Sequence, residues 1–283
     1  AHDIVASAQA EYRRLLSVLY SDGYFGPNIR VFVDGREAAT LPPFSNIGKV
    51  EKAEIRVSPG PQFQFGKANV LPQAPQTKIP EEFATGKTAR TGVISTATGA
   101  AIRGWRDDGH AKAQVKNQSI TANHRDDTLD VDIRLNPGPK LSFGNLSVSG
   151  KTIMSHERMR DLIALPVGET FSPHELDKIS KRLRRTGIFR SVSITEAQDV
   201  GPDQTLDVEV RVEDDLPNRI TAGAELESDD GLTLSANWLH RNLFGGGERL
   251  VLDAEVSSIG AQSGGLDVLA SAELTRPATF QAD

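Results

Sequence analysis

Two stretches of sequence with the same pattern decide the fold: EIRVSPGP at residues 54–61 and DIRLNPGP at residues 132–139. Each is followed by a Phe-Gly pair, at residues 65–66 and 143–144, and the two copies lie 78 residues apart. Agreement of separate motifs at one offset indicates a structural repeat. The chain is therefore expected to contain modules that follow one another and share a fold.

A second marker supports the repeat. Gly109 and Gly187 each precede an expected strand, and they are also 78 residues apart. A third, partial copy of this marker, DGYF at residues 22–25, lies upstream. Within each unit the expected order is one strand, two helices and two strands, which places a helix pair on a small mixed sheet. This order predicts an α+β fold of tandem β-α-α-β-β modules.

The helix signals are clearest in the last unit. Ser172 suits an N-cap, Pro173 suits the first turn, and Gly187 suits the C-terminal stop of one helix. Apolar residues recur on one face of this segment, as on a helix that packs against a sheet. The expected elements of the unit are a strand at residues 141–149, helices at 155–163 and 173–186, and strands at 188–195 and 206–212.

After Pro217 the helical period gives way to alternation. Four segments carry an apolar residue at every second position, near residues 220–226, 232–238, 250–256 and 266–274. The pattern is typical of transmembrane β-strands, and also of a soluble antiparallel sheet that packs its apolar face on another element. Spacing alone leaves both interpretations open. Four strands are too few to close a barrel.

The composition excludes several classes of protein. The net charge of −6 argues against a nucleic-acid binder, because neutralising phosphates requires an excess of Lys and Arg. The chain has no cysteine, which excludes disulfides, thiol catalysis and cysteine metal sites. At 25% charged residues it is too polar for a helical membrane protein. No signal peptide is visible at Ala1, so an exported protein would begin upstream of this residue.

Together, the repeat and the alternating tail resemble the superfamily of outer-membrane assembly proteins that join polypeptide-transport-associated (POTRA) modules to a β-barrel. DDGLTL at residues 229–234 and RNLFGGGERL at residues 241–250 are similar to the opening barrel hairpin of that family. The resemblance covers nearly the whole chain. It implies an outer-membrane protein with its POTRA modules in the periplasm. The implied domains are POTRA modules at residues 1–60 (lacking its first strand), 61–138 and 139–215, and the first four strands of an incomplete barrel at 216–283.

The resemblance also implies protein transport without bond-making chemistry. The implied partners are unfolded outer-membrane proteins or autotransporters, a large inner-membrane-anchored protein and outer-membrane lipid, with no nucleic acid and no cofactor. Three functions compete. The first is an insertion factor for autotransporter-type barrels. The second is a general barrel-assembly factor or a secretion pore for one passenger, and the third is a soluble periplasmic scaffold.

Sheet edges are the expected binding sites, because an edge presents unpaired N–H and C=O groups to another extended chain. The expected edges are residues 28–33, 111–119 and 188–194 in the modules, and residues 218–227 at the barrel seam. Gly223 would permit close backbone approach at the seam, although a steric or turn-related glycine fits equally well. The open edge of the incomplete tail sheet predicts that the tail either pairs with another copy of the chain or is disordered. The candidate residues are Ile29, Val31, Val33, Val115, Ile188, Val192, Ile194, Ile220, Gly223 and Leu226.

No grouping of residues indicates catalysis. His156-Glu157 and His174-Glu175 lack the second histidine that completes a zinc-protease helix. The glycines at 245–247 lack the Lys-Ser/Thr of a phosphate loop and indicate a turn. Residues 229–231 lack the further ligands of a calcium loop and indicate a hairpin tip. We therefore expect a protein that is not an enzyme and has no catalytic, metal or cofactor residues.

Overall fold

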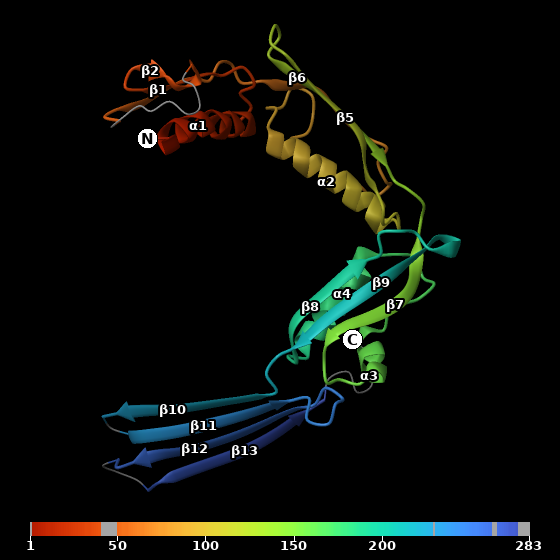
Figure 1. Ribbon diagram of the computed structural model, residues 1–283. Helices are drawn as coiled ribbons and strands as arrows, with labels where there is room; N and C mark the ends of the chain where they lie inside the picture. The colour runs from red at the N-terminus through yellow and green to blue at the C-terminus, as the bar shows by residue number, and fades with distance from the viewer. Residues whose placement is uncertain (1, 41–49, 229, 262–264, 277–283) are drawn as a thin grey trace. The chain divides into compact units, whose positions relative to one another are not determined.

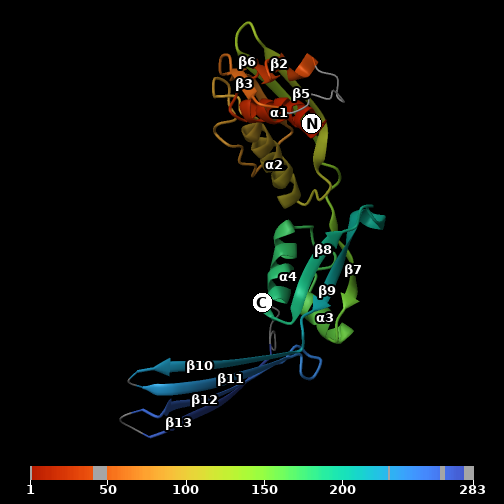
Figure 2. The same ribbon diagram turned by 60° about the vertical axis from the view of Figure 1, so that its left-hand side comes forward.

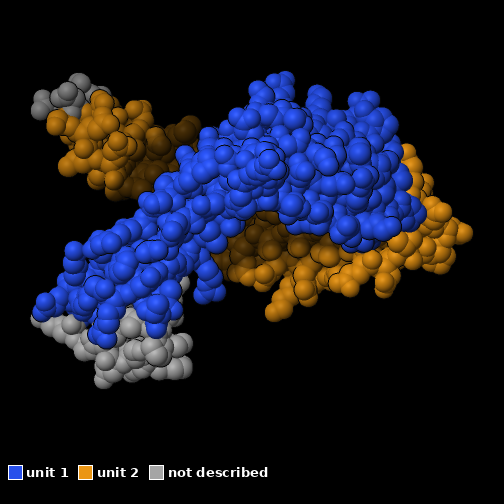
Figure 3. All heavy atoms as spheres, turned by 90° about the horizontal axis from the view of Figure 1, so that it is seen from above, with its two compact units in different colours: residues 1–139 blue, residues 140–283 orange. Residues whose placement is uncertain are grey.

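A computed structural model describes residues 2–40, 50–228, 230–261 and 265–276. The chain divides into two compact units, residues 1–139 and 140–283 (Figure 3). Asp229, in the expected hairpin tip, lies outside the described residues. No helix in the described ranges is long and apolar enough to cross a membrane.

The first unit begins with a small module around one helix. This module contains α1 (His2–Ser21), β1 (Asn28–Val33), β2 (Arg36–Glu37), a short 3-10 helix (Ala38–Thr40) and β3 (Ala53–Ser58). Its sheet has the order β2-β1-β3. The core consists of Val31, Val33 and Ala38, with Tyr12, Ile29 and Val50 packed against it.

The second module of this unit has a larger core. It contains β4 (Gln64–Leu71), α2 (Thr91–Asp107), β5 (Gln114–Asn123) and β6 (Thr128–Asn136). The central strand β6 is parallel to β4 and antiparallel to β5, and α2 lies beside this sheet (Figure 1). Alternation along β6 directs every second side chain into the core. These residues, none more than 4% exposed, are Leu129, Val131, Ile133 and Leu135.

This module has one helix where the repeat predicted two, so the prediction of a helix pair was wrong here. Residues 72–90 form turns and extended chain instead. Pro72, Pro75 and Pro80 explain the difference, because proline removes a helical N–H and restricts the residue before it. From this loop Phe83, only 6% exposed, fills part of the core.

The second unit begins with a module that confirms the β-α-α-β-β order. It contains β7 (Ser142–Lys151), α3 (His156–Ile163), α4 (Pro173–Arg185), β8 (Phe189–Glu196), a 3-10 turn (Pro202–Gln204) and β9 (Thr205–Asp214), with the sheet order β7-β9-β8. Gly187 follows α4 at φ +67°, as a helix stop requires. Ser172 is the N-cap residue as predicted, but its hydroxyl makes no cap bond. Ser155 does cap α3, where its hydroxyl accepts from the Arg158 N–H at 3.2 Å.

The repeated Phe-Gly pairs occupy a β-bulge in each of the two larger modules. The register of β4 against β6 shifts at Gly66, and that of β7 against β9 shifts at Gly144. A Cβ on Gly66 would overlap the carboxylate of Asp130, and one on Gly144 would overlap that of Asp207. Both glycines therefore leave room for an aspartate on the central strand, and this explains why the pair recurs.

The tail of the chain forms an open antiparallel sheet. Its strands are β10 (Asn218–Glu227), β11 (Gly231–Arg241), β12 (Arg249–Ile259) and β13 (Asp267–Thr275), which lie side by side in this order (Figures 1 and 2). Residues paired across strands share a face, so the register separates an apolar face from a polar face. Two neighbouring rows show this: Ile220-Trp238-Leu252-Ala272 on the apolar face and Thr221-Asn237-Asp253-Ser271 on the polar face.

The apolar face is uncovered in the described part of the chain. Every residue of β10 and β13 is exposed. Ile220 is 77% exposed, Leu226 80% and Val268 69%. Apolar side chains in contact with water on this scale normally mark a surface that binds a partner or a membrane.

Candidate functional site

The strand β1, predicted as an open edge, lies inside its sheet, so this prediction was wrong. It pairs with β3 along its whole length and with β2 at its last two residues. The cause is the turn at Asp34-Gly35, whose φ angles of 48° and 79° suit a tight hairpin. Val31 and Val33 are buried in the core, and Ile29 packs against it. These three candidate residues stabilise the module from inside.

The part of β1 that β2 leaves open is occupied by a side chain of α1. The Tyr12 hydroxyl accepts a hydrogen bond from the Val31 N–H at 3.0 Å. It also lies 3.4 Å from the Val31 carbonyl oxygen, to which it donates. One hydroxyl thus takes the place of a neighbouring strand at this residue.

We expect Tyr12→Phe to lower the free energy of unfolding of the N-terminal module by about 1–2 kcal/mol, because two backbone groups lose their partner. Urea denaturation followed by circular dichroism measures the change. Tyr24→Phe is the control, since the Tyr24 side chain makes no hydrogen bond with any other described residue. Equal destabilisation by the two substitutions would contradict the assigned role.

The strand β5 is an open edge, as predicted for residues 111–119, although the strand itself begins at Gln114. It pairs with β6 on one side and with no described strand on the other. Val115 is half-buried against the core, whereas Ile120 is 42% exposed. Within the described ranges, no side chain from elsewhere bonds to the β5 backbone. This edge is therefore free to accept another strand.

The strand β8 is also an edge of its sheet, as predicted. Ile188 and Val192 face the core at 1% and 7% exposure, and Ile194 is half-buried. Nη2 of Arg184, in the last turn of α4, donates to the Val192 carbonyl oxygen at 2.9 Å. One acceptor on this strand is thus already engaged, which distinguishes β8 from β5.

The strand β10 forms the first edge of the tail sheet. It pairs with β11 from Asn218 to Glu227 and has no described strand on its other side. Ile220 and Leu226 lie on the apolar face, and Gly223 lies on the polar face. Gly223 is not a turn residue, since it pairs with Ser235 in mid-strand. Among the described residues, an added Cβ would approach only Ser235 Oγ, at 2.8 Å.

Arg241, at the end of β11, connects the tail sheet to the preceding module. Its Nε donates to the Gly187 carbonyl oxygen and its Nη1 to the Leu216 carbonyl oxygen, both at 2.9 Å. Nη2 lies 3.3 Å from a carboxylate oxygen of Asp215, and the arginine side chain is only 12% exposed. The backbone N–H of Arg241 donates to the Pro217 carbonyl oxygen at 2.7 Å. One guanidinium therefore holds both the module and the segment that leads into β10.

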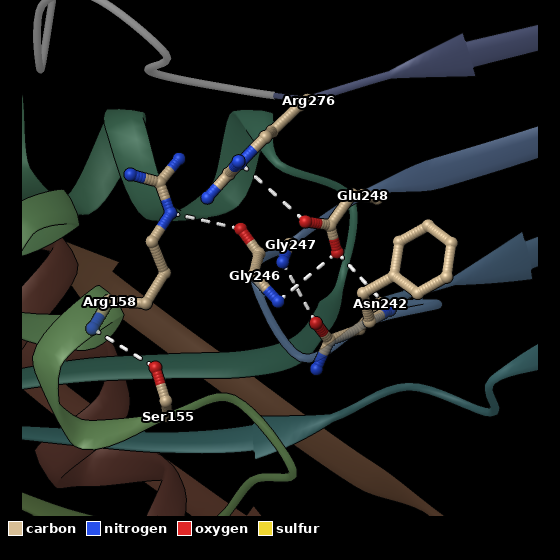
Figure 4. A network of polar contacts seen from close by, with 8 residues as sticks. Ser155, Arg158, Asn242, Gly246, Gly247, Glu248 and Arg276 are labelled. Atoms are coloured by element: carbon tan, nitrogen blue, oxygen red, sulfur yellow. Dashed lines mark hydrogen bonds and ion pairs between the residues drawn. The ribbon is translucent and has the colours of Figure 1, made fainter.

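The turn between β11 and β12, residues 242–248, is held from inside by a carboxylate (Figure 4). Glu248 accepts hydrogen bonds from the N–H groups of Phe244 at 3.2 Å and Gly246 at 3.1 Å. The side-chain oxygen of Asn242 accepts from the Gly247 N–H at 2.8 Å. The glycine-rich stretch is thus an ordered turn, as the sequence predicted, and not a phosphate loop.

Glu248 is buried, at 6% exposure. Burial acts to raise the pKa of this carboxyl, but the backbone hydrogen bonds and Arg276 together outweigh burial and hold the pKa below its ordinary value of 4.5. Arg276 Nε lies 3.5 Å from the carboxylate. The ionised form is therefore the one that organises the turn.

The same turn contacts helix α3 of the preceding module. Arg158 Nε donates to the Gly246 carbonyl oxygen at 2.9 Å (Figure 4). The Ser155 N–H donates to the Gly245 carbonyl oxygen at 3.3 Å. Sequence reasoning assigned no role to these contacts or to Arg241. The available signal was RNLFGGGERL itself, in which polar residues flank three consecutive glycines. Among the described residues, no three His, Cys, Asp or Glu side chains are grouped to hold a metal.

Comparison with known proteins identifies a family model and a relative that are similar to this chain. A family model described as "POTRA: Surface antigen variable number repeat" matches residues 141–214, the module that contains β7, α3, α4, β8 and β9. The outer membrane protein assembly factor BamA of Neorickettsia risticii (strain Illinois) is 22% identical over 214 residues. The match covers 73% of this chain, which spans 28% of the length of that relative.

Two solved structures share the fold. BamA from Haemophilus ducreyi lacking POTRA domains 1–3 has a TM-score of 0.59 at 18% identity, over 78% of this chain and 41% of that one. Haemophilus influenzae BamA POTRA3–5 has a TM-score of 0.53 at 18% identity, over 72% of this chain and 79% of that one. The predicted α+β fold class with POTRA-like sheets is confirmed. Residues 141–214 match the POTRA family model, and the chain is similar in sequence to an outer membrane protein assembly factor of the BamA type.

Proposed function

We propose that this chain belongs to an outer-membrane protein assembly factor that binds extended segments of unfolded outer-membrane proteins. Binding occurs by β-augmentation, in which the segment adds as a strand to an open sheet edge. The protein lies at the outer membrane, with its POTRA modules in the periplasm. In this proposal residues 216–283 are the first strands of a transmembrane barrel.

The strand β10 is the observation that carries the proposal. It is paired over ten residues on one side and has no described strand on the other, at the edge of a sheet whose apolar face no described element covers. An apolar face of this kind suits contact with lipid, while the open edge supplies backbone donors and acceptors to an incoming strand. A soluble scaffold would require another element to cover that face, and the described part of the chain supplies none.

In this proposal the open strand edges of the POTRA modules bind a substrate segment before β10 does. The free backbone of β5, and that of β8 beyond Val192, would hold a segment before it reaches the barrel seam. Neither edge needs a fixed side-chain pocket, because main-chain hydrogen bonds provide the affinity. This suits substrates that share an alternation of polar and apolar residues but have no common sequence.

The narrower proposal concerns the substrate and the partner. Three POTRA modules, at residues 1–60, 61–138 and 139–215, directly before barrel strands resemble TamA, the outer-membrane subunit of the translocation and assembly module. That resemblance implies autotransporter-type substrates and a large inner-membrane-anchored partner of the TamB type. Homology to BamA favours a second candidate, a general barrel-assembly factor. Depletion of the protein distinguishes them: selective loss of autotransporters supports the first, and loss of most outer-membrane barrels supports the second.

Site-specific photo-cross-linking tests strand addition at β10. A cross-linking residue replaces Ile220 in the full-length protein, which is then mixed with a urea-unfolded outer-membrane barrel protein. We expect cross-links at Ile220 and at least about tenfold fewer at Leu252. Leu252 is the matched control, because it lies in the same row of the apolar face but on the inner strand β12. Equal yields at both positions, or none at Ile220, would refute augmentation at this edge.

A further inference from the structure

We infer that Arg241 couples strand pairing at the β8 edge of the last POTRA domain to the pairing of β10 with β11 at the seam. The inference rests on the proposed function of the two edges. It adds a route by which occupation of the periplasmic edge reaches the membrane edge. The residue acts by positioning other groups, since nothing places it in contact with substrate.

The beginnings of the two edge strands are neighbours in space. The Asp215 N–H donates to the carbonyl oxygen of Ile188 at 2.7 Å, and Ile188 directly precedes β8. Asp215 is three residues before Asn218, where β10 begins. A shift of the backbone at the start of β8 therefore acts on the segment that enters β10.

Arg241 strengthens this connection with the three donors of one planar group. The guanidinium bonds the Gly187 carbonyl oxygen on the β8 side and the Leu216 carbonyl oxygen on the β10 side, and it pairs with the Asp215 carboxylate. Arginine presents its donors in a rigid fork, so these three acceptors must keep a fixed geometry relative to one another. Because the side chain is largely buried, water does not readily replace the bonds.

The second contact between module and sheet does not provide the same route. Arg158 and Ser155 of α3 bond to Gly246 and Gly245 in the turn between β11 and β12. These bonds fix the inner strands and leave β10 untouched. Displacement at the start of β8 therefore reaches the seam strand through Arg241 and the segment at residues 215–217.

Amide hydrogen exchange on the full-length protein tests the positioning role. We expect Arg241→Lys to raise the exchange of the amides of residues 219–221 and 188–190 at least about tenfold, because a lysine cannot serve three separate acceptors at once. The matched control is Arg249→Lys, the same substitution at an exposed residue that pairs with Arg241 across β11 and β12. We expect no change at either segment in the control. Unchanged exchange in Arg241→Lys would overturn the inference.

A double substitution tests the coupling itself. Val192→Ala loosens β8 from its core, and it should raise exchange at residues 219–221 about threefold when Arg241 is present. In an Arg241→Lys background, Val192→Ala should not raise the exchange at residues 219–221 any further. An equal increase in exchange in both backgrounds would overturn the coupling, whatever cross-linking at Ile220 shows. Failure of the coupling is therefore distinct from failure of the proposed function.

If Arg241→Lys does not fold, Asp215→Asn replaces it, with an expected increase in the exchange of these amides of about threefold.

Discussion

Replacing Gly150 by alanine is expected to lower the free energy of unfolding of the module at residues 141–214 by about 3–5 kcal/mol. Gly150 lies in β7 at φ +104°, a conformation that side chains rarely adopt. It also pairs directly with Val212 of the central strand β9, and a Cβ there would overlap the Val212 carbonyl oxygen. Backbone in the middle of a sheet cannot move aside, so the free-energy cost of the strained φ angle adds to the cost of the steric overlap.

Urea-dependent amide exchange of β9 measures this loss in the intact chain. The matched control is Gly168→Ala, in the same domain. Gly168 has φ +85°, but an added Cβ would meet no heavy atom of the described residues within 4 Å. We expect the control to lower the free energy of unfolding by only about 1 kcal/mol, the cost of placing alanine at a positive φ angle. A loss for Gly150→Ala no larger than that of the control would show that β7 and β9 can separate without cost.

Replacing Glu248 by alanine is expected to release the turn between β11 and β12 from helix α3. The carboxylate is the acceptor for the Phe244 and Gly246 N–H groups, and without it the Gly246 carbonyl oxygen no longer has a fixed position opposite Arg158. Bonds to a charged acceptor contribute about 1.5–3 kcal/mol, so we expect these two amides to exchange about a hundredfold faster. Glu248→Gln is the control, because its amide oxygen still accepts both bonds; equal exchange in the two variants would contradict this account.

The same turn should respond to acid. In the folded protein the pKa of Glu248 lies below its ordinary value of 4.5. A lowered pKa means that the carboxylate stabilises the turn fully above the ordinary pKa, and that this contribution is lost as the pH falls through the folded pKa. After correction for intrinsic exchange rates, protection of Phe244 and Gly246 should therefore decline below about pH 4.5 in the unmodified chain and stay constant in Glu248→Ala.

The sequence predicted some elements well because their signals are local. Gly187 ends α4 at positive φ, and alternation along β9 buries Leu206, Val208, Val210 and Val212, as a period of two requires. The predictions failed where a local signal was overlooked in favour of the repeat. Three prolines at residues 72–90 forbid the helix that the repeat implied, and Asp34-Gly35 forms the hairpin that places β1 inside its sheet.

The sequence by itself determined the order of helices and strands in the module at residues 141–214 and the two faces of the tail sheet, because periodicity and spacing are properties of the chain alone. Only the tertiary structure decided which strand edges are open. Tyr12 and Arg184 occupy backbone acceptors from helices, and no pattern along a strand reveals such a contact. The contacts of Arg241 were equally invisible, since Gly187 is 54 residues away along the chain. Edges and junctions depend on pairings between distant segments, and these form only when the chain folds.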